Sequence, residues 1–244
     1  PLLYLAQVAA AGGRIAGYVD TTPAANGLAA APHLWGALRN LPYIRKGLKL
    51  RGELRRSGIP IHRADAVEAV GEGRVERIRF RAGGAWVEQP CDTLLLHEGV
   101  VPNVHVTMAI GCAHDWDERQ GCFRPRLDEW GRTDIEAILV AGDCGGIEGA
   151  RAAEARGRLV ALGAAASLGR LSEAERDRLA RPLRRELDRH LPIRAFLDTL
   201  YRPRPAVTCP ADAVIACRCE SITAGQVRET VRIGAVGPNQ AKSF

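Results

Sequence analysis

The sequence contains few aromatic residues, few lysines and no long apolar run. Phe, Trp and Tyr make up 5% of its 244 residues, and Lys46, Lys49 and Lys242 are the only lysines. A membrane-spanning helix needs about 18 or more consecutive apolar residues, so we expect no transmembrane segment. The first residues lack an initiator Met and a charged leader, so we expect no signal peptide and a chain that begins inside a larger gene product.

Redox motifs based on paired cysteines are also scarce. The seven cysteines are an odd number without a secretory context, which disfavours a disulfide framework and predicts a reducing, cytoplasmic location. There is no C-x-x-C pair of the thioredoxin type. Only Cys217 and Cys219 are close enough in the sequence to suggest shared chemistry.

The net charge of +6 rests almost wholly on arginine. Many arginines alternate with Glu and Asp, as between residues 173 and 189, and this spacing is typical of a solvated helix face. Aromatic residues do not interleave with the charge as they do on nucleic-acid-binding surfaces, so we expect no nucleic-acid partner. The mild basicity instead suits a cofactor that carries phosphate.

The most specific motif lies between residues 131 and 150, GRTDIEAILVAGDCGGIEGA. Its apolar run, 135–140, predicts a buried parallel strand, and a glycine-rich turn then leads to a helix predicted from Arg151 to Leu168. A helix start after such a turn favours anionic or polar ligands. Asp143 would stand at the carboxyl end of the strand, where its carboxylate can accept hydrogen bonds from hydroxyls. The alternative is that Asp143 only caps the helix.

This motif resembles the second flavin motif of two-dinucleotide-domain flavoproteins, the glutathione-reductase and ferredoxin-reductase kind. In that family the aspartate hydrogen-bonds a ribityl hydroxyl of FAD, and the turn lies near the flavin and the pyrophosphate. The resemblance therefore implies FAD contacts at one short segment, namely Gly142, Asp143, Gly145, Gly146 and Ile147.

The first residues predict part of a nucleotide-binding unit. Residues 2–11 predict a helix that ends at Gly12-Gly13, and residues 14–19 predict a strand that closes on Asp20. This order is the second half of a βαβ unit, in which the acid can hold a ribose hydroxyl, although the glycine fingerprint that should precede the helix is absent. Asp20 is equally well interpreted as a turn residue. The unit could hold NAD(P), ATP or nothing.

The following segment predicts an antiparallel meander and then a return strand. Residues 66–70, 74–81 and 85–89 have strand patterns separated by glycine turns, and their alternation predicts a sheet with one solvent-exposed face. An apolar strand closing on Gly99-x-x-Pro102-Asn103 follows, and it resembles the strand by which the same flavoproteins leave an inserted dinucleotide domain. That places a domain crossing near Pro102.

The last residues carry a C-x-C motif. Such a turn places two thiolates side by side, which suits a shared iron–sulfur site and is poor geometry for a mutual disulfide. Cys217-Arg218-Cys219-Glu220, a helix capped by Thr223 and the stretch 237–242 resemble the bacterioferritin-associated-ferredoxin-like [2Fe–2S] module. In that family two further cysteines follow, so we expect two of the four cluster ligands here, Cys217 and Cys219. The alternative is two ordinary thiols.

The order of these units resembles the FAD-binding α subunit of hetero-oligomeric amino-acid dehydrogenases, namely opine oxidase, D-hydroxyproline or proline dehydrogenase and hydrogen cyanide synthase. The resemblance implies about the second half of such a subunit, with an α/β two-dinucleotide-binding-domain fold. We expect an inserted NAD(P)-binding-like domain at 1–101, the end of the FAD-binding domain at 102–170, a helical linker at 171–208 and a truncated [2Fe–2S] module at 209–244.

The same resemblance implies a function. A partner flavoprotein subunit would oxidise the C–N bond of an amino acid or opine, and this subunit would relay electrons through FAD and [2Fe–2S] to an acceptor. No residue makes a convincing general base, so no catalytic residue is predicted. Two alternatives remain: an NAD(P)H-dependent reductase of the flavin or ferredoxin type, and a non-enzymatic iron–sulfur or nucleotide-sensing adaptor.

Overall fold

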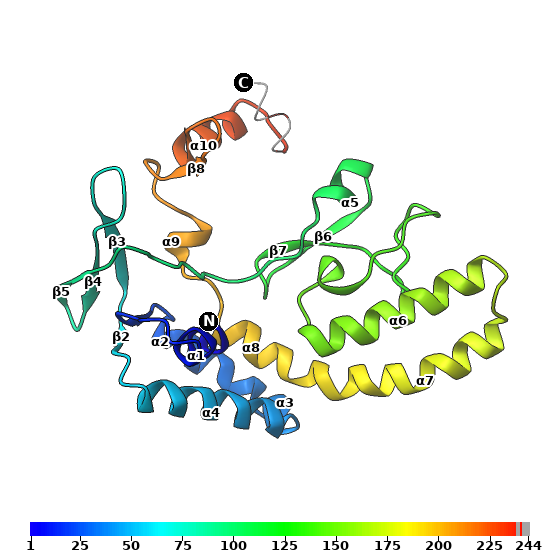
Figure 1. The fold of residues 1–244 in the computed structure, drawn as a ribbon. Coiled ribbons are helices and arrows are strands. Elements are labelled where there is room, and N and C mark those ends of the chain that lie inside the picture. Colours follow the sequence, from blue (N-terminus) through cyan, green and yellow to red (C-terminus); the bar gives the residue numbers. More distant parts are fainter. Residues whose placement is uncertain (238–239, 241–244) are drawn as a thin grey trace. The chain divides into compact units, whose positions relative to one another are not determined.

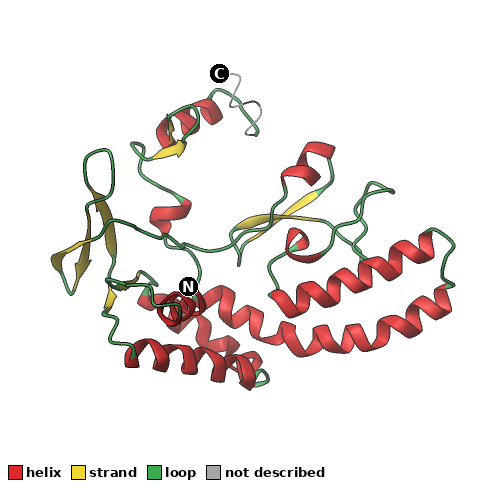
Figure 2. Ribbon diagram, in the orientation of Figure 1, coloured by secondary structure: helices red, strands yellow, loops and turns green. Residues whose placement is uncertain are grey.

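The computed structural model describes residues 1–237 and 240, and the chain divides into two compact units, Pro1–Arg202 and Pro203–Phe244. Helices predominate and the strands are short (Figure 1; Figure 2). The described strands form small sheets of two or three strands. The fold is therefore mixed α/β, as predicted, whereas its dinucleotide-binding and ferredoxin-like character stays a prediction. In the described part of the chain no helix is long and apolar enough to cross a membrane.

The first segment of unit 1, residues 1–63, contains a helix and then two parallel strands that are joined through further helices. The first helix ends where predicted, because the N–H of Gly13 donates to the carbonyl of Val8 and Gly12 takes a φ of +81°. The two strands of this segment pair with each other in parallel. The elements are α1 (Leu2–Ala10), β1 (Tyr18–Asp20), α2 (Ala24–Ala30), η1 (Ala31–His33), α3 (Leu34–Leu38), α4 (Leu41–Arg56) and β2 (Ile61–Arg63).

The predicted meander is confirmed. It consists of β3 (Ala66–Val70), β4 (Arg77–Ala82) and β5 (Ala85–Pro90), paired in antiparallel order. Ile78 and Phe80 of β4 are buried, and the Phe80 ring centroid lies 4.9 Å from that of His62 on β2. This contact packs the meander against the parallel pair, while the alternate residues of β4 are arginines in salt bridges.

Two segments that the sequence predicts as strands take other conformations. Residues 93–104 form no regular secondary structure, and the side chains of Leu95 and Leu96 are 66% and 73% exposed. The run 135–140 makes only an isolated bridge between Leu139 and Arg132. The strand prediction for 135–140 is therefore wrong. A buried parallel strand requires neighbours for its N–H and C=O groups, and no described segment lies beside this run as a parallel strand.

A short helix and a hairpin precede the glycine-rich turn. In the hairpin loop, Asp117 accepts hydrogen bonds from the backbone N–H groups of Arg119 (2.9 Å) and Gln120 (3.0 Å), which fixes the loop. The strands pair in antiparallel register from His114 opposite Pro125 to Asp117 opposite Cys122. The elements are α5 (His105–Ile110), β6 (His114–Asp117) and β7 (Cys122–Pro125).

A helical hairpin supplies the larger core of unit 1. Helices α6 (Ala150–Ser167) and α7 (Glu173–His190) lie side by side and antiparallel (Figure 1). As predicted, Ser172 caps α7 by accepting a hydrogen bond from the Glu175 N–H at 3.2 Å. Trp130 packs into this core with residues from both helices, namely Ala152, Ala155, Leu159, Ala180 and Leu187. The helix predicted from Arg151 to Leu168 is thus confirmed.

The remaining elements are η3 (Leu191–Ile193) and α8 (Arg194–Leu200) in unit 1, and α9 (Pro205–Thr208), β8 (Ile215–Cys217), β9 (Ile222–Thr223) and α10 (Ala224–Arg232) in unit 2. Thr223 caps α10 as predicted, in a capping box with Gln226. The predicted turn at 237–240 lies mostly outside the described residues. The unit boundary at Arg202 falls within the predicted linker 171–208, and the four predicted domains stay predictions.

Candidate functional site

The glycine-rich turn after residue 140 is a short 3-10 helix, η2 (Gly142–Gly145), followed by Gly146. Gly142 and Gly146 have φ angles of +68° and +146°, which side-chain-bearing residues rarely adopt. Space is also limited, because a Cβ added at Gly145 would stand 2.9 Å from a methyl group of Leu127. The turn therefore depends on glycine for both conformation and packing.

Asp143 is exposed in this turn, and its carboxylate accepts no hydrogen bond and forms no ion pair with another described residue. Helix α6 begins only at Ala150, its N-cap is Gly149, and no side chain caps it. Asp143 is thus not the cap of α6, which removes the cap-only alternative. Its carboxylate is available to hydroxyl donors from outside the described chain.

A groove of about 620 Å³ lies beside the turn. Gly142, Gly145 and Gly146 line it from the turn, and the β6–β7 hairpin and α6 line it from the other sides. Asp143 and Ile147 are not part of this lining. The structure therefore brings three of the five predicted flavin-contact residues to the groove wall, and Asp143 and Ile147 stay outside the lining.

Arg124 of β7 contacts the turn directly. Its Nε donates to the carbonyl of Gly145 at 3.3 Å, and its Nη1 pairs with Asp117 at 2.9 Å. A Cβ at Gly146 would stand 2.5 Å from the same guanidinium. Burial would raise the pKa of Asp117, but hydrogen bonds from the Gln120 backbone and from Arg124 outweigh it and hold this pKa below its usual value. The Asp117 carboxylate is therefore ionised at neutral pH.

Gln120 holds the next residue of the turn from the hairpin loop. Its Nε2 donates to the carbonyl of Ile147 at 2.8 Å, and its Oε1 accepts from the Ile147 N–H at 3.4 Å. The same Nε2 donates to Asp198 of α8 at 3.2 Å, and Asp198 forms an ion pair with Arg194. Burial raises the pKa of Asp198, although Arg194 opposes this.

Sequence reasoning missed both Arg124 and Gln120. Their partners lie 21 and 27 residues away in the chain, and no local motif marks either side chain. The N–H groups of Gly146 and Ile147 are also occupied within the protein, by the Asp143 carbonyl and by Gln120. These two N–H groups are therefore not free to donate to a ligand in this structure.

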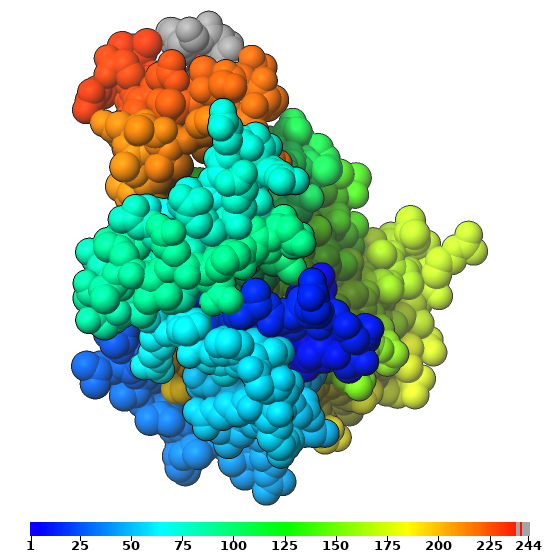
Figure 3. All heavy atoms as spheres, turned by 60° about the vertical axis from the view of Figure 1, so that its left-hand side comes forward, coloured from blue at the N-terminus to red at the C-terminus, as the bar shows by residue number. Residues whose placement is uncertain are grey.

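Asp20 lies in a different groove, of about 760 Å³, on the face of the β1–β2 pair beside α1 and α4. Figure 3 shows α1 and α4 next to one another on the surface of unit 1. The Asp20 carboxylate accepts a hydrogen bond from the Thr22 N–H at 3.1 Å, so Asp20 does act as a turn residue in the structure. Three arginines of the same groove form no salt bridge with a described residue, namely Arg51, Arg55 and Arg63.

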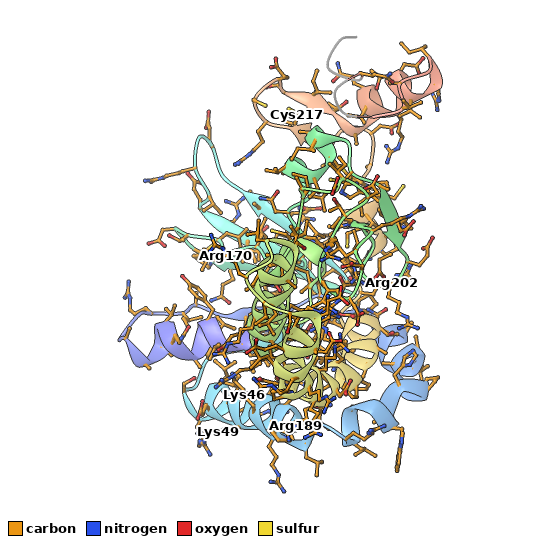
Figure 4. The ribbon with its side chains drawn as sticks, turned by 90° about the vertical axis from the view of Figure 1, so that its right-hand side faces the viewer. Lys46, Lys49, Arg170, Arg189, Arg202 and Cys217 are labelled. Carbon is orange, nitrogen blue, oxygen red and sulfur yellow. The ribbon has the colours of Figure 1, made fainter. Side chains whose placement is uncertain are left out.

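Cys217 and Cys219 lie in the β8–β9 hairpin of unit 2, where Figure 4 labels Cys217. Their sulfur atoms are 3.1 Å apart, and no disulfide joins cysteines in the described residues. Two thiols in this arrangement can face one shared metal. The described residues contain no group of three or more potential metal ligands. Cys209 instead lies beside Arg228, at 3.6 Å from its Nη2.

The chain is similar to known opine oxidase subunits. The chain is 41% identical over 251 residues to the A-subunit of opine oxidase from Rhizobium meliloti (strain 1021), which covers the whole chain and 54% of that protein. It is 37% identical over 253 residues to the corresponding opine oxidase A-subunit of Agrobacterium tumefaciens (strain Ach5), again over the whole chain. The chain is homologous over its full length to the opine oxidase A-subunit.

A second group of relatives extends this homology. Hydrogen cyanide synthase subunit HcnB of Pseudomonas aeruginosa is 29% identical over 248 residues, which cover 96% of the chain. No protein-family model matches the chain. The chain spans about half the length of the curated relatives it matches. The resemblance to opine oxidase and hydrogen cyanide synthase that the motifs predict is confirmed, and both relatives are components of oxidoreductases.

Proposed function

We propose that the protein is an electron-transferring subunit of a hetero-oligomeric oxidoreductase that acts on an amino acid or opine. The homology to the opine oxidase A-subunit over the full chain carries this proposal. A partner subunit would oxidise the C–N bond of the substrate, and this protein would pass the electrons to an acceptor. The cytoplasmic location and the absence of a nucleic-acid partner stay predictions from the sequence.

We infer that FAD binds at the turn 142–147. The residues present fit such a group, because Gly142, Gly145 and Gly146 line the groove and Asp143 offers an exposed carboxylate with no partner among the described residues. Asp143 would hold a hydroxyl of the ribityl chain. Gly142 would allow the cofactor to approach the backbone, because only the Ala153 methyl group, at 3.9 Å, lies within 4 Å of a Cβ added there. When bound, FAD would supply the capacity to accept and release electrons.

Cys217 and Cys219 would provide two ligands of a [2Fe–2S] cluster in unit 2. Their sulfur separation and their place in one hairpin support a shared metal. The cluster would supply a one-electron carrier, and the protein's own part would be to hold it and exclude other chemistry.

The groove at Asp20 favours a second candidate function, an NAD(P)H-dependent reductase. Its arginines without acidic partners among the described residues suit a phosphate-bearing nucleotide, and Asp20 suits a ribose hydroxyl. In this case electrons would enter from NAD(P)H instead of from an amino acid. The two functions differ in which reductant the protein accepts.

An absorption spectrum of the full-length protein, co-expressed with its partner subunit, tests these proposals. We expect flavin and iron–sulfur bands that are bleached anaerobically by an opine or amino acid and not by NADH. Bleaching by NADH alone would support the reductase instead.

Replacement of the flavin-turn carboxylate tests the proposed binding site. We expect Asp143→Ala to lower the flavin content while far-UV circular dichroism stays unchanged, because the side chain is exposed and forms no hydrogen bond or ion pair with a described residue. Full flavin content and activity in this variant would contradict the proposal.

A further inference from the structure

The β6–β7 hairpin loop and β7 each supply a side chain that contacts the backbone of the proposed flavin turn, 142–147. Arg124 donates to the carbonyl of Gly145, and Gln120 pairs with both the N–H and the carbonyl of Ile147. Such contacts set the orientation of the peptide groups themselves. We propose that Arg124 and Gln120 are positioning residues for FAD, which act through the turn; this inference rests on the proposed function.

The orientation of Arg124 is itself fixed. Asp117 binds its Nη1, and the loop N–H groups of Arg119 and Gln120 hold the Asp117 carboxylate in place. The guanidinium then fills the space that a side chain at Gly146 would need. The ion pair therefore holds the group that contacts the Gly145 carbonyl, and it adds a steric reason for glycine at position 146 to the one given by its φ of +146°.

The orientation of the Gln120 amide is fixed as well. Its Nε2 faces two acceptors, the Ile147 carbonyl and Asp198, while its Oε1 faces the Ile147 N–H. A flipped amide would place its oxygen against two other oxygens, so only one orientation satisfies the network. Asp198 lies on α8, and the turn is thereby connected to the last helix of unit 1.

The groove has little free charge to attract a cofactor by itself. Three of the four arginines that line the groove are paired, Arg124 with Asp117, Arg126 with Asp115 and Arg156 with Glu148, while Arg119 forms no salt bridge with a described residue. Since the basic side chains are largely neutralised, affinity for FAD would depend on the shape and direction of the turn backbone more than on net attraction. Residues that hold the backbone should therefore affect binding: Gln120 does so from outside the groove lining, whereas Arg124 also lines the groove.

The test uses the full-length protein separated from its partner subunit, which would bind a flavin of its own; the protein is freed of flavin and titrated with FAD. We expect Arg124→Gln and Gln120→Met each to weaken FAD binding about tenfold, the effect of losing one well-placed hydrogen bond, and to change the visible circular dichroism of the bound flavin. Arg158→Gln is the matched control, because Arg158 forms an exposed ion pair with Glu154 on α6 and lines neither groove.

The outcomes separate the two proposals. If the unmodified protein binds no FAD, the proposed function fails and this inference fails with it. If the unmodified protein binds FAD and both variants keep its affinity and flavin spectrum, only the positioning role is overturned. Weaker binding accompanied by loss of far-UV helical signal in both variants would also overturn it, because the two residues would then only support the fold.

Discussion

Tyr18 lines the same groove as Asp20, and these surroundings shift the pKa of its phenol. Burial, followed by the negative charge of Asp20 and the nearby Tyr201, raises the pKa of Tyr18 to about 12, while Arg51 acts in the opposite direction. An unfolded tyrosine titrates near pH 10, so folding favours the protonated phenol. This contribution to stability is complete below about pH 10 and is lost as the pH rises through about 12.

An absorbance titration of tyrosinate checks this assignment. We expect one of the four tyrosines to ionise late, Tyr18→Phe to remove that step, and Asp20→Asn to move it to lower pH. A late step that persists in Tyr18→Phe would show that another tyrosine is responsible.

Within the element α6, two glycines have opposite surroundings. A Cβ at Gly163 would stand 2.8 Å from the Cβ of Trp130, whereas nothing lies within 4 Å of a Cβ at Gly157. Alanine is preferred over glycine inside a helix by roughly 1 kcal/mol. We therefore expect Gly157→Ala to raise the free energy of unfolding by up to about 1 kcal/mol, and Gly163→Ala to lower it by about 1–3 kcal/mol through overpacking.

Urea unfolding followed by far-UV circular dichroism measures both changes. The two variants serve as controls for one another, since they make the same substitution in the same helix. Equal shifts in the same direction would mean that Trp130 does not press against Gly163 in solution.

At the scale of the whole molecule, the division into two units predicts that the proposed iron–sulfur site and the proposed flavin site can each be lost without the other. Cys217 and Cys219 lie in unit 2, and the turn proposed to bind flavin, 142–147, lies in unit 1. We expect Cys217→Ser together with Cys219→Ser to remove iron from the purified full-length protein while its flavin content stays unchanged. Cys209→Ser is the matched control, because Cys209 contacts Arg228 and we assign it no cluster role. Iron and flavin contents measured on the same sample decide the matter.

Two outcomes would contradict this prediction. Retention of iron in the double variant would show that other residues hold the metal. Loss of flavin together with iron would show that the two sites depend on each other.

The sequence by itself determined the elements whose signals are local. The end of α1 at Gly12-Gly13, the caps Ser172 and Thr223, and the meander with Phe80 inside follow from residues a few positions apart. The same local signals located Asp143 in a glycine turn and paired Cys217 with Cys219. Family resemblance, confirmed by the full-length homology, came from the order of these motifs.

Only the tertiary structure decided what surrounds those residues. Arg124 and Gln120 reach the turn across 21 and 27 residues, and Asp198 reaches Gln120 across 78, so no periodicity or local motif could reveal them. The same reason explains the wrong strand at 135–140, because an apolar run becomes a parallel strand only when neighbouring strands bind its backbone. Local patterns determine which conformations a segment prefers, and distant contacts determine which of them it adopts.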